Sequence, residues 1–166
     1  MVLAIASCDK DSKETSGAGG AEVTPVGYVD LGLPSGTKWK ADNETNPNDT
    51  CDFYTYDEAV AKFGDNLPKK EDFDELMSFC TYTWDYEYRG ACLVSTINGK
   101  SIFLPATGYR GCSGILYGEG SCGAYWSKTP YDVDYAWNLS CGSENFNMNH
   151  YYGGRCLGYS VRLVHD

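Results

Sequence analysis

A candidate catalytic base lies close to the C-terminus of the chain. His150 stands in the run Met148-Asn-His-Tyr-Tyr152, and Asp132 or Asp134 would be its partner if the fold brought them together. An acid–base enzyme also needs a nucleophile within hydrogen-bonding reach of the base, and no motif in this region supplies one. A lone loop histidine among tyrosines and asparagines is more often a contact residue than a catalyst. The sequence therefore favours binding over catalysis, and we expect the protein not to be an enzyme.

Metal and disulfide chemistry are the next alternatives, because the chain has 8 cysteines and 2 histidines. No two cysteines have the CxxC spacing of a zinc site, and Asp132 with Asp134 offers too few oxygen ligands for a Ca²⁺ site. We therefore expect no metal ion and no other cofactor. Cys112 and Cys122 flank a Gly-rich loop and are the first candidates for a disulfide, although spacing alone leaves the connectivity open.

A recognition surface is the preferred interpretation of the segment from Tyr131 to Tyr159. It is rich in Tyr, Gly, Ser and Asn, the residue types of recognition loops, in which rigid rings supply contact area and small polar groups supply hydrogen bonds. We expect the ligand-binding residues to be Tyr131, Asp132, Asp134, Tyr135, Asn138, Asn145, Asn147, Asn149, His150, Tyr151, Tyr152 and Tyr159.

The charge distribution restricts the partners. The chain has a net charge of −10, which opposes nucleic-acid binding because such binding requires basic patches. All of this net charge lies between Asp42 and Glu87, where 13 acidic residues outnumber 3 lysines, whereas Tyr88–Asp166 carries a net +1. We expect the acidic run to be a solvated helix surface. Recognition in the C-terminal half should then depend on aromatic contact and hydrogen bonding, with little long-range steering.

Two helices are expected in the middle of the chain. The run Thr55-Tyr-Asp-Glu58 is a capping-box pattern, and the short helix that it begins should stop at Gly64. A second helix should follow Pro68 and run to Cys80. Its apolar face, at helical spacing, comprises Phe73, Leu76, Met77 and Cys80.

Beyond Thr81 the hydrophobic period changes to two, which predicts half-buried antiparallel strands. Ala91–Ile97 and Lys100–Leu104 should pair as a hairpin around Asn98-Gly99, because both turn residues tolerate a positive φ. Further strands are expected over residues 135–140 and 159–164. The expected buried tryptophans are Trp39, Trp84, Trp126 and Trp137. Two helices, short antiparallel strands and long loops in 166 residues indicate one α+β domain.

The N-terminal run Ile5-Ala-Ser-Cys8 resembles the lipobox of bacterial lipoproteins. The resemblance implies that Cys8 is acylated and anchors the protein at the bacterial outer membrane or cell surface. The apolar run before Cys8 is short and has no preceding Lys or Arg, so residues 1–8 correspond to a truncated signal segment. Residues 9–25, which are polar and Gly-rich, are then a flexible tether, and residues 26–166 are the folded domain.

Six motifs occur in order from Tyr28 to the end of the chain: Tyr28–Trp39, Asn66–Leu76, Cys80–Trp84, Asn98–Arg110, Tyr125–Pro130 and Gly158–Arg162. Together they resemble the Fibrobacter succinogenes major paralogous domain, which is common in exported lipoproteins of gut Bacteroidetes. The resemblance implies a C-type-lectin-like fold of the formylglycine-generating-enzyme type. The chain departs from the family pattern in two places. The segment after Trp39 is shorter, and Lys69 stands where the family has a Thr N-cap, which costs about 1 kcal/mol of helix stability.

Some members of this group are variable proteins, in which diversity-generating retroelements rewrite a C-terminal segment. The resemblance therefore implies a ligand-binding surface over Tyr131–Tyr159, for a protein or a glycan, with Arg155 bracing the loop. It also offers an origin for Cys141 and Cys156 as products of diversification that need not be disulfide partners. Two alternatives remain open. One is a structural subunit of a surface appendage or glycan-uptake complex, and the other is a formylglycine-generating-type enzyme, which would need a redox-active cysteine pair.

Overall fold

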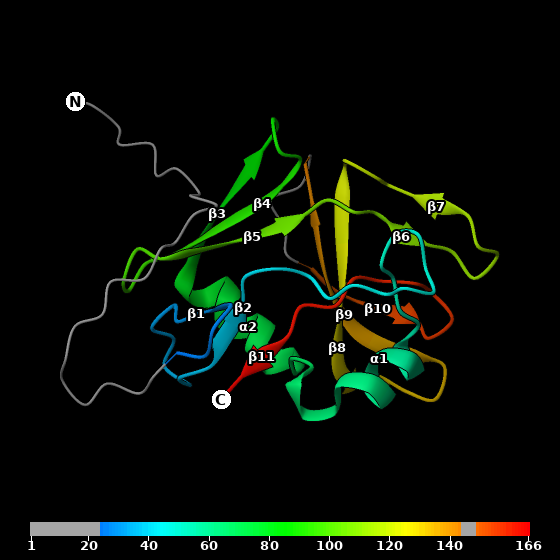
Figure 1. Ribbon diagram of the computed structural model, residues 1–166, viewed down its shortest axis with the longest axis horizontal. Coiled ribbons are helices and arrows are strands. Elements are labelled where there is room, and N and C mark those ends of the chain that lie inside the picture. The colour runs from blue at the N-terminus through cyan, green and yellow to red at the C-terminus, as the bar shows by residue number, and fades with distance from the viewer. Residues whose placement is uncertain (1–23, 144–148) are drawn as a thin grey trace.

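The computed structural model of the chain describes residues 24–143 and 149–166, with residues 149–153 described through their backbone. Within these ranges the protein is an α+β fold with two α-helices and several small antiparallel sheets, as the sequence predicts (Figure 1). The expected anchor Cys8, the signal segment 1–8, most of the tether 9–25 and the predicted contact residues Asn145 and Asn147 lie outside the described residues.

Both expected helices are present. They are α1 (Tyr56–Phe63), followed by a 3-10 turn η1 (Gly64–Asn66), and α2 (Lys70–Phe79). The capping box of α1 is confirmed, because the N–H and the hydroxyl of Thr55 both donate to Glu58 Oε2 at 2.8 Å. Helix α2 keeps half of such a box, since the N–H of Lys69 donates to Asp72 Oδ2 at 2.7 Å. The helix therefore begins where it is expected, although Lys69 provides no side-chain cap.

The expected apolar face of α2 is confirmed in part. Phe73 and Leu76 are buried in the larger of two apolar clusters. Met77 is only half-buried, and Cys80 already begins the next strand, so the helix is one residue shorter than the sequence predicts.

The strands of the described residues form three three-stranded antiparallel sheets and one two-stranded sheet. In spatial order they are β1 (Tyr28–Val29), β2 (Lys38–Lys40) and β11 (Val164–His165); β3 (Cys80–Asp85), β4 (Gly90–Ser95) and β5 (Ser101–Pro105); β10 (Asn149–Gly154), β9 (Tyr135–Gly142) and β8 (Cys122–Pro130); and β6 (Tyr109–Arg110) with β7 (Leu116–Tyr117). The predicted hairpin is confirmed as β4 and β5, with Gly99 in its turn at a φ of 75°. Strand β2 pairs with both β1 and β11, so the two ends of the folded part meet in one small sheet, on either side of β2 (Figure 1).

The stretch 159–163 differs from the half-buried strand that its alternation predicts. All five residues are buried, and isolated bridges join the stretch to Tyr54 and to Tyr125. The N–H of Glu44 also donates to its Val161 carbonyl at 2.9 Å. Chain segments therefore cover this stretch from more than one side, and alternating polarity does not translate into alternating exposure.

Two apolar clusters fill the interior, and β8 contributes to both. Successive residues of a strand point to opposite faces of its sheet, so Tyr125 joins one cluster while Ala124 and Trp126 join the other. The tryptophans divide into the fully buried Trp39 and Trp126 and the half-buried Trp84 and Trp137. The core prediction is thus confirmed for two tryptophans, and burial is incomplete for the other two.

A buried cation, Arg162, joins the last segment of the chain to two other parts of the fold. Arg162 is 1% exposed, and its guanidinium donates to the carbonyls of Lys40 and Ala41 and, at 2.7 Å, to that of Phe103. Its Nε donates to Asn43 Oδ1 at 2.9 Å. Burial lowers the pKa of this guanidinium from its ordinary value. Hydrogen bonds to protein oxygens therefore replace the water that the cation loses.

Replacing Arg162 with Lys should lower the free energy of unfolding by about 2–4 kcal/mol, because an ammonium cannot reproduce the planar fork and leaves buried acceptors unpaired. Urea unfolding followed by tryptophan fluorescence measures the change. Arg89→Lys, at an exposed position, is the matched control. If R162K stayed within about 0.5 kcal/mol of the unmodified protein, the range of ordinary surface substitutions, the guanidinium would not be the constraint described here.

Candidate functional site

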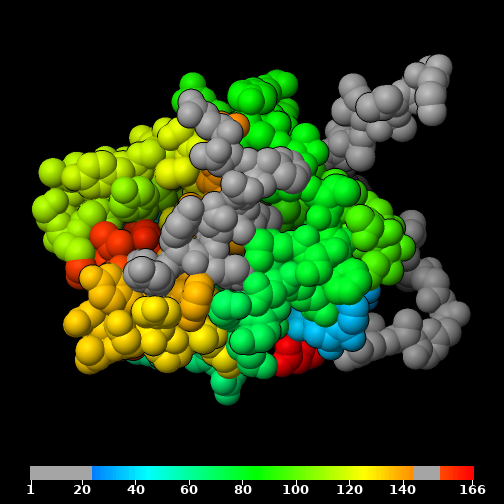
Figure 2. Space-filling view, turned by 180° about the vertical axis from the view of Figure 1, so that it is seen from behind, coloured from blue at the N-terminus to red at the C-terminus, as the bar shows by residue number. Residues whose placement is uncertain are grey.

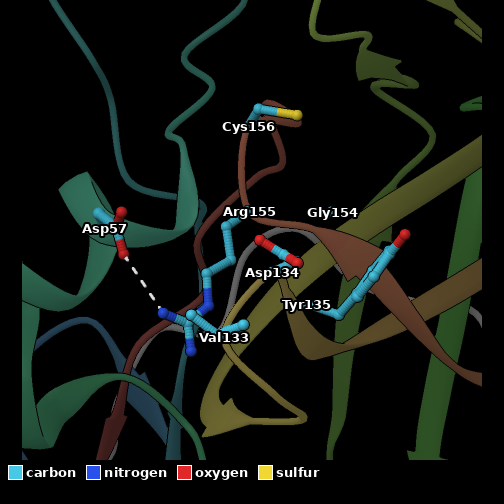
Figure 3. A pocket seen from close by; sticks show the side chains of 7 residues that line it. All are labelled: Asp57, Val133, Asp134, Tyr135, Gly154, Arg155 and Cys156. Atoms are coloured by element: carbon cyan, nitrogen blue, oxygen red, sulfur yellow. Dashed lines mark ion pairs between the residues drawn. The ribbon is translucent and has the colours of Figure 1, made fainter.

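Three segments that are far apart in the sequence enclose a hollow of about 340 Å³ at the surface. They are the first turn of α1, the turn between β8 and β9, and the residues at and just after the end of β10. The lining residues are Asp57, Val133, Asp134, Tyr135, Gly154, Arg155 and Cys156 (Figure 3). The volume is at the lower end of the range of about 300–1,000 Å³ that small-molecule pockets occupy.

The side chain of Asp132 holds the turn between β8 and β9. Its Oδ1 accepts the N–H of Asp134 at 2.9 Å and that of Tyr135 at 2.8 Å, which is an Asx turn. The N–H of Tyr131 donates to the carbonyl of Tyr135 at 3.0 Å and closes the turn. Asp132 was expected to contact a ligand, but its carboxylate is engaged by the backbone. The residue therefore shapes the turn that presents its neighbours.

Arg155 holds the three segments against one another. Its Nη2 donates to the carbonyl of Asp132 at 2.7 Å, and its N–H donates to the carbonyl of Asp134 at 2.9 Å. Its guanidinium carbon lies 4.7 Å from the centre of the Tyr56 ring in α1. Nη1 is 4.0 Å from Asp57 Oδ1, a pair of small energetic weight because the Asp57 side chain is 80% exposed. These contacts confirm the bracing role that the family resemblance implies for Arg155.

A disulfide joins Cys112 to Cys156, which corrects the expected pairing of Cys112 with Cys122. An antiparallel bridge pairs Arg110 with Gly158, so the residues two positions away in opposite directions face each other. The Cα atoms of Cys112 and Cys156 are accordingly 5.2 Å apart. Cys122 is a free, half-buried thiol at the start of β8. Cys156 thus forms a disulfide, which corrects the interpretation that this cysteine need not be a disulfide partner.

The rim of the hollow carries exposed apolar side chains. Tyr131 is 50% exposed, Val133 80% and Tyr135 41%; the first two lie in the turn between β8 and β9, and Tyr135 closes the turn as the first residue of β9. The ring of Tyr131 packs edge-on against Trp137, with the ring centres 5.5 Å apart. From behind, the gold turn 131–135 and the red-orange segment 154–158 lie next to each other at one edge of the molecule (Figure 2). We call the hollow and this turn the hollow face.

The structure brings four of the expected contact residues together on the hollow face, namely Tyr131, Asp132, Asp134 and Tyr135. Four others lie in β10, where the backbone of Asn149, His150, Tyr151 and Tyr152 pairs with β9 from Ser140 to Trp137. The end of this strand, at Gly154, reaches the hollow.

Two expected contact residues belong to the interior, which is a correction. Asn138 is 2% exposed and lies opposite Trp126 within the β8–β9 pair. Tyr159 is 7% exposed, and its ring centre is 4.2 Å from that of Trp126. Both residue types are common in recognition loops, but here the packing around Trp126 removes their side chains from the surface.

Asp57 is a site residue that the sequence does not reveal. It was expected on an acidic face apart from the recognition half of the chain. Helix α1 instead packs on β8, where the Tyr56 hydroxyl donates to the carbonyl of Lys128 at 2.8 Å, and this contact carries Asp57 to the hollow. A carboxylate from the acidic segment therefore lines the hollow beside residues of the C-terminal half. Val133, by contrast, could have been noticed in the sequence, because it is a single apolar residue between two aspartates.

No group of three or more His, Cys, Asp or Glu side chains within residues 24–143 and 149–166 is arranged to hold a metal ion. No helix in the described part of the chain is long and apolar enough to cross a membrane. Comparisons of the chain with protein-family models, with curated proteins and with solved structures found no match.

Replacing Cys112 and Cys156 together with Ser should lower the free energy of unfolding by about 3–4 kcal/mol, because the disulfide closes a separation of 44 residues in the unfolded chain. Urea unfolding measures the effect, and Cys122→Ser is the control for loss of a thiol that forms no disulfide. A double variant as stable as the unmodified protein would show that this disulfide does not restrain the segment behind the hollow.

Proposed function

We propose that the protein binds a ligand outside the cytoplasm through the hollow face. The observation that carries the proposal is that one short turn presents three exposed apolar side chains, Tyr131, Val133 and Tyr135, beside a partly charged hollow. Exposed apolar patches next to a cavity with a few polar groups are typical of binding sites. The Asx turn and the Arg155 brace support the proposal, because a preordered turn loses little conformational entropy on binding.

The fold that we propose is C-type-lectin-like, of the formylglycine-generating-enzyme type. Three observations support it: the six motifs occur in order, the architecture is α+β with small antiparallel sheets, and motif residues form the buried centre. Among these residues are Trp39, Trp126 and Arg162, each 1% exposed or less.

The location that we propose is the outer membrane or cell surface of a bacterium, with a lipid anchor at Cys8. The lipobox-like sequence supports this location. The Cys112–Cys156 disulfide gives it weak support, because disulfides are rare in the reducing cytoplasm. The net charge of −10 argues against a nucleic-acid partner, so the candidate partners are a protein or a glycan.

A fixed contact in an assembly is the second candidate function. Tyr86 is 77% exposed and Tyr88 58% exposed on the turn between β3 and β4, so apolar surface is not confined to the hollow face. The gene neighbourhood separates the two candidates. A reverse transcriptase and a template repeat that differs at adenines would support diversified binding, and their absence would favour the fixed contact.

Three free thiols of the described residues, Cys80, Cys122 and Cys141, argue against an enzyme of the formylglycine-generating type. Burial raises the pKa of Cys80 to about 11, with the nearby Glu75 adding to the shift. Burial also raises the pKa of the Cys122 and Cys141 thiols. A thiol must ionise to react as a nucleophile, so these environments disfavour redox activity.

Binding through the hollow face can be tested with the full chain carrying Cys8→Ser, which removes the lipid attachment. Ligands are first selected on glycan and protein arrays. Val133→Ser and Tyr135→Ala should each weaken binding of a selected ligand about tenfold or more, because each removes apolar surface that the ligand would bury. Isothermal titration calorimetry measures the change.

The matched controls are Ile97→Ser and Tyr86→Ala, whose side chains are 51% and 77% exposed on other turns. They should bind the ligand like the parent chain. If the hollow-face variants bound it with unchanged affinity while remaining folded, the proposed function would be wrong.

A further inference from the structure

Two carboxylates in the hollow indicate the charge of its ligand. The Asp57 side chain is 80% exposed, and Asp134 on the opposite segment is also exposed. Among the described residues, the carboxylate of Asp134 has no hydrogen-bond or ion-pair partner. Both groups are therefore open to solvent, and Asp57 is also 4.0 Å from Nη1 of Arg155. They come from α1 and from the β8–β9 turn, so they line the hollow from different segments.

The cation in the lining, Arg155, is turned toward the protein. Its Nη2 donates to the Asp132 carbonyl, and its Nε is buried and has no hydrogen-bond partner among the described residues. The guanidinium also lies against the Tyr56 ring. The close-up shows it directed at Asp57 and next to Val133, with Asp134 and Tyr135 on the other side of the Arg155 side chain from Asp57 (Figure 3). The hollow thus presents two carboxylates and one cation that is already occupied, and its accessible charge is negative.

We infer, on the basis of the function proposed above, that the hollow binds a basic side chain, Lys or Arg, of a partner protein. Asp57 and Asp134 receive the charged head, and Val133 and Tyr135 cover the aliphatic stem. Lys and Arg side chains commonly bury their methylene groups on apolar surface while the head stays at a polar rim. A neutral glycan would also donate hydroxyl groups to these carboxylates, but it would leave their negative charge uncompensated.

The net charge of the chain supports the same partner class. At −10, the protein as a whole attracts cationic surfaces, which raises the rate of encounter at low salt. Ion pairs at exposed positions contribute only about 0–1 kcal/mol each, so one basic side chain binds weakly by itself. The apolar rim and further contacts of a protein partner would supply the rest of the affinity.

The test is an NMR titration of the ¹⁵N-labelled full chain carrying Cys8→Ser. The probe is Nα-acetyl-lysine methylamide, and its uncharged isostere is Nα-acetyl-norleucine methylamide. The lysine probe should shift the amide signals of Asp134, Tyr135 and Arg155 and leave those of the β3–β4 turn unchanged. Asp134→Asn and Asp57→Asn should each weaken its binding about threefold to fivefold, in keeping with the loss of one exposed ion pair. Glu87→Gln, at an exposed acidic position outside the hollow, should have no effect.

Equal binding of the norleucine isostere, or unchanged lysine binding in both Asp variants, would overturn the inference. The array ligand then separates the two proposals. If its binding depends on Val133 but not on Asp57 or Asp134, the proposed function stands and the basic-side-chain inference fails. If the binding of no ligand depends on Val133 or Tyr135, both fail.

Discussion

The buried guanidinium of Arg162 is the constraint on which the rest of the structure depends. A cation in the interior is tolerated only when protein groups replace its hydration, and here the oxygens come from the end of β2, from the residues that follow it and from Phe103 in β5. The hydroxyl of Tyr125 in β8 donates to the carbonyl of Pro105 at the end of the same β5, at 2.6 Å. The last segment can therefore cross the interior only when these parts of the fold are in place. Strand β8 contributes side chains to both apolar clusters.

The hollow face depends on this scaffold and on three local restraints. The Asx turn at Asp132 sets the shape of the β8–β9 turn, Arg155 fastens that turn to α1, and the Cys112–Cys156 disulfide holds the segment behind the hollow. None of these restraints uses the side chains of Val133, Asp134 or Tyr135. The turn is thus ordered through its backbone and the Asp132 carboxylate, while Val133, Asp134 and Tyr135 stay exposed. A preorganised binding surface requires such an arrangement.

Local interactions were predictable from the sequence, whereas long-range ones were not. The capping box at Thr55 and the Asn98-Gly99 turn involve neighbours in the chain, and their residue types specify the geometry. The burial of Arg162 depends on partners more than 100 residues away in the sequence. The alternating pattern of residues 159–164 alone predicts an ordinary polar position in a strand. The Cys112–Cys156 pairing follows from the backbone bridge between Arg110 and Gly158, and the positions of the cysteines in the sequence do not reveal that bridge. Composition marked the recognition segment, but packing decided which of its side chains face outward.

Hydrogen–deuterium exchange of the Cys8→Ser chain, with and without a ligand selected on the arrays, tests most directly whether the hollow face is the binding surface. Ligand binding there predicts slower exchange at the backbone amides of residues 131–135 and 154–156, with unchanged exchange at the β3–β4 turn, residues 86–89. Slower exchange at the β3–β4 turn, with residues 131–135 and 154–156 unaffected, would contradict binding through the hollow face.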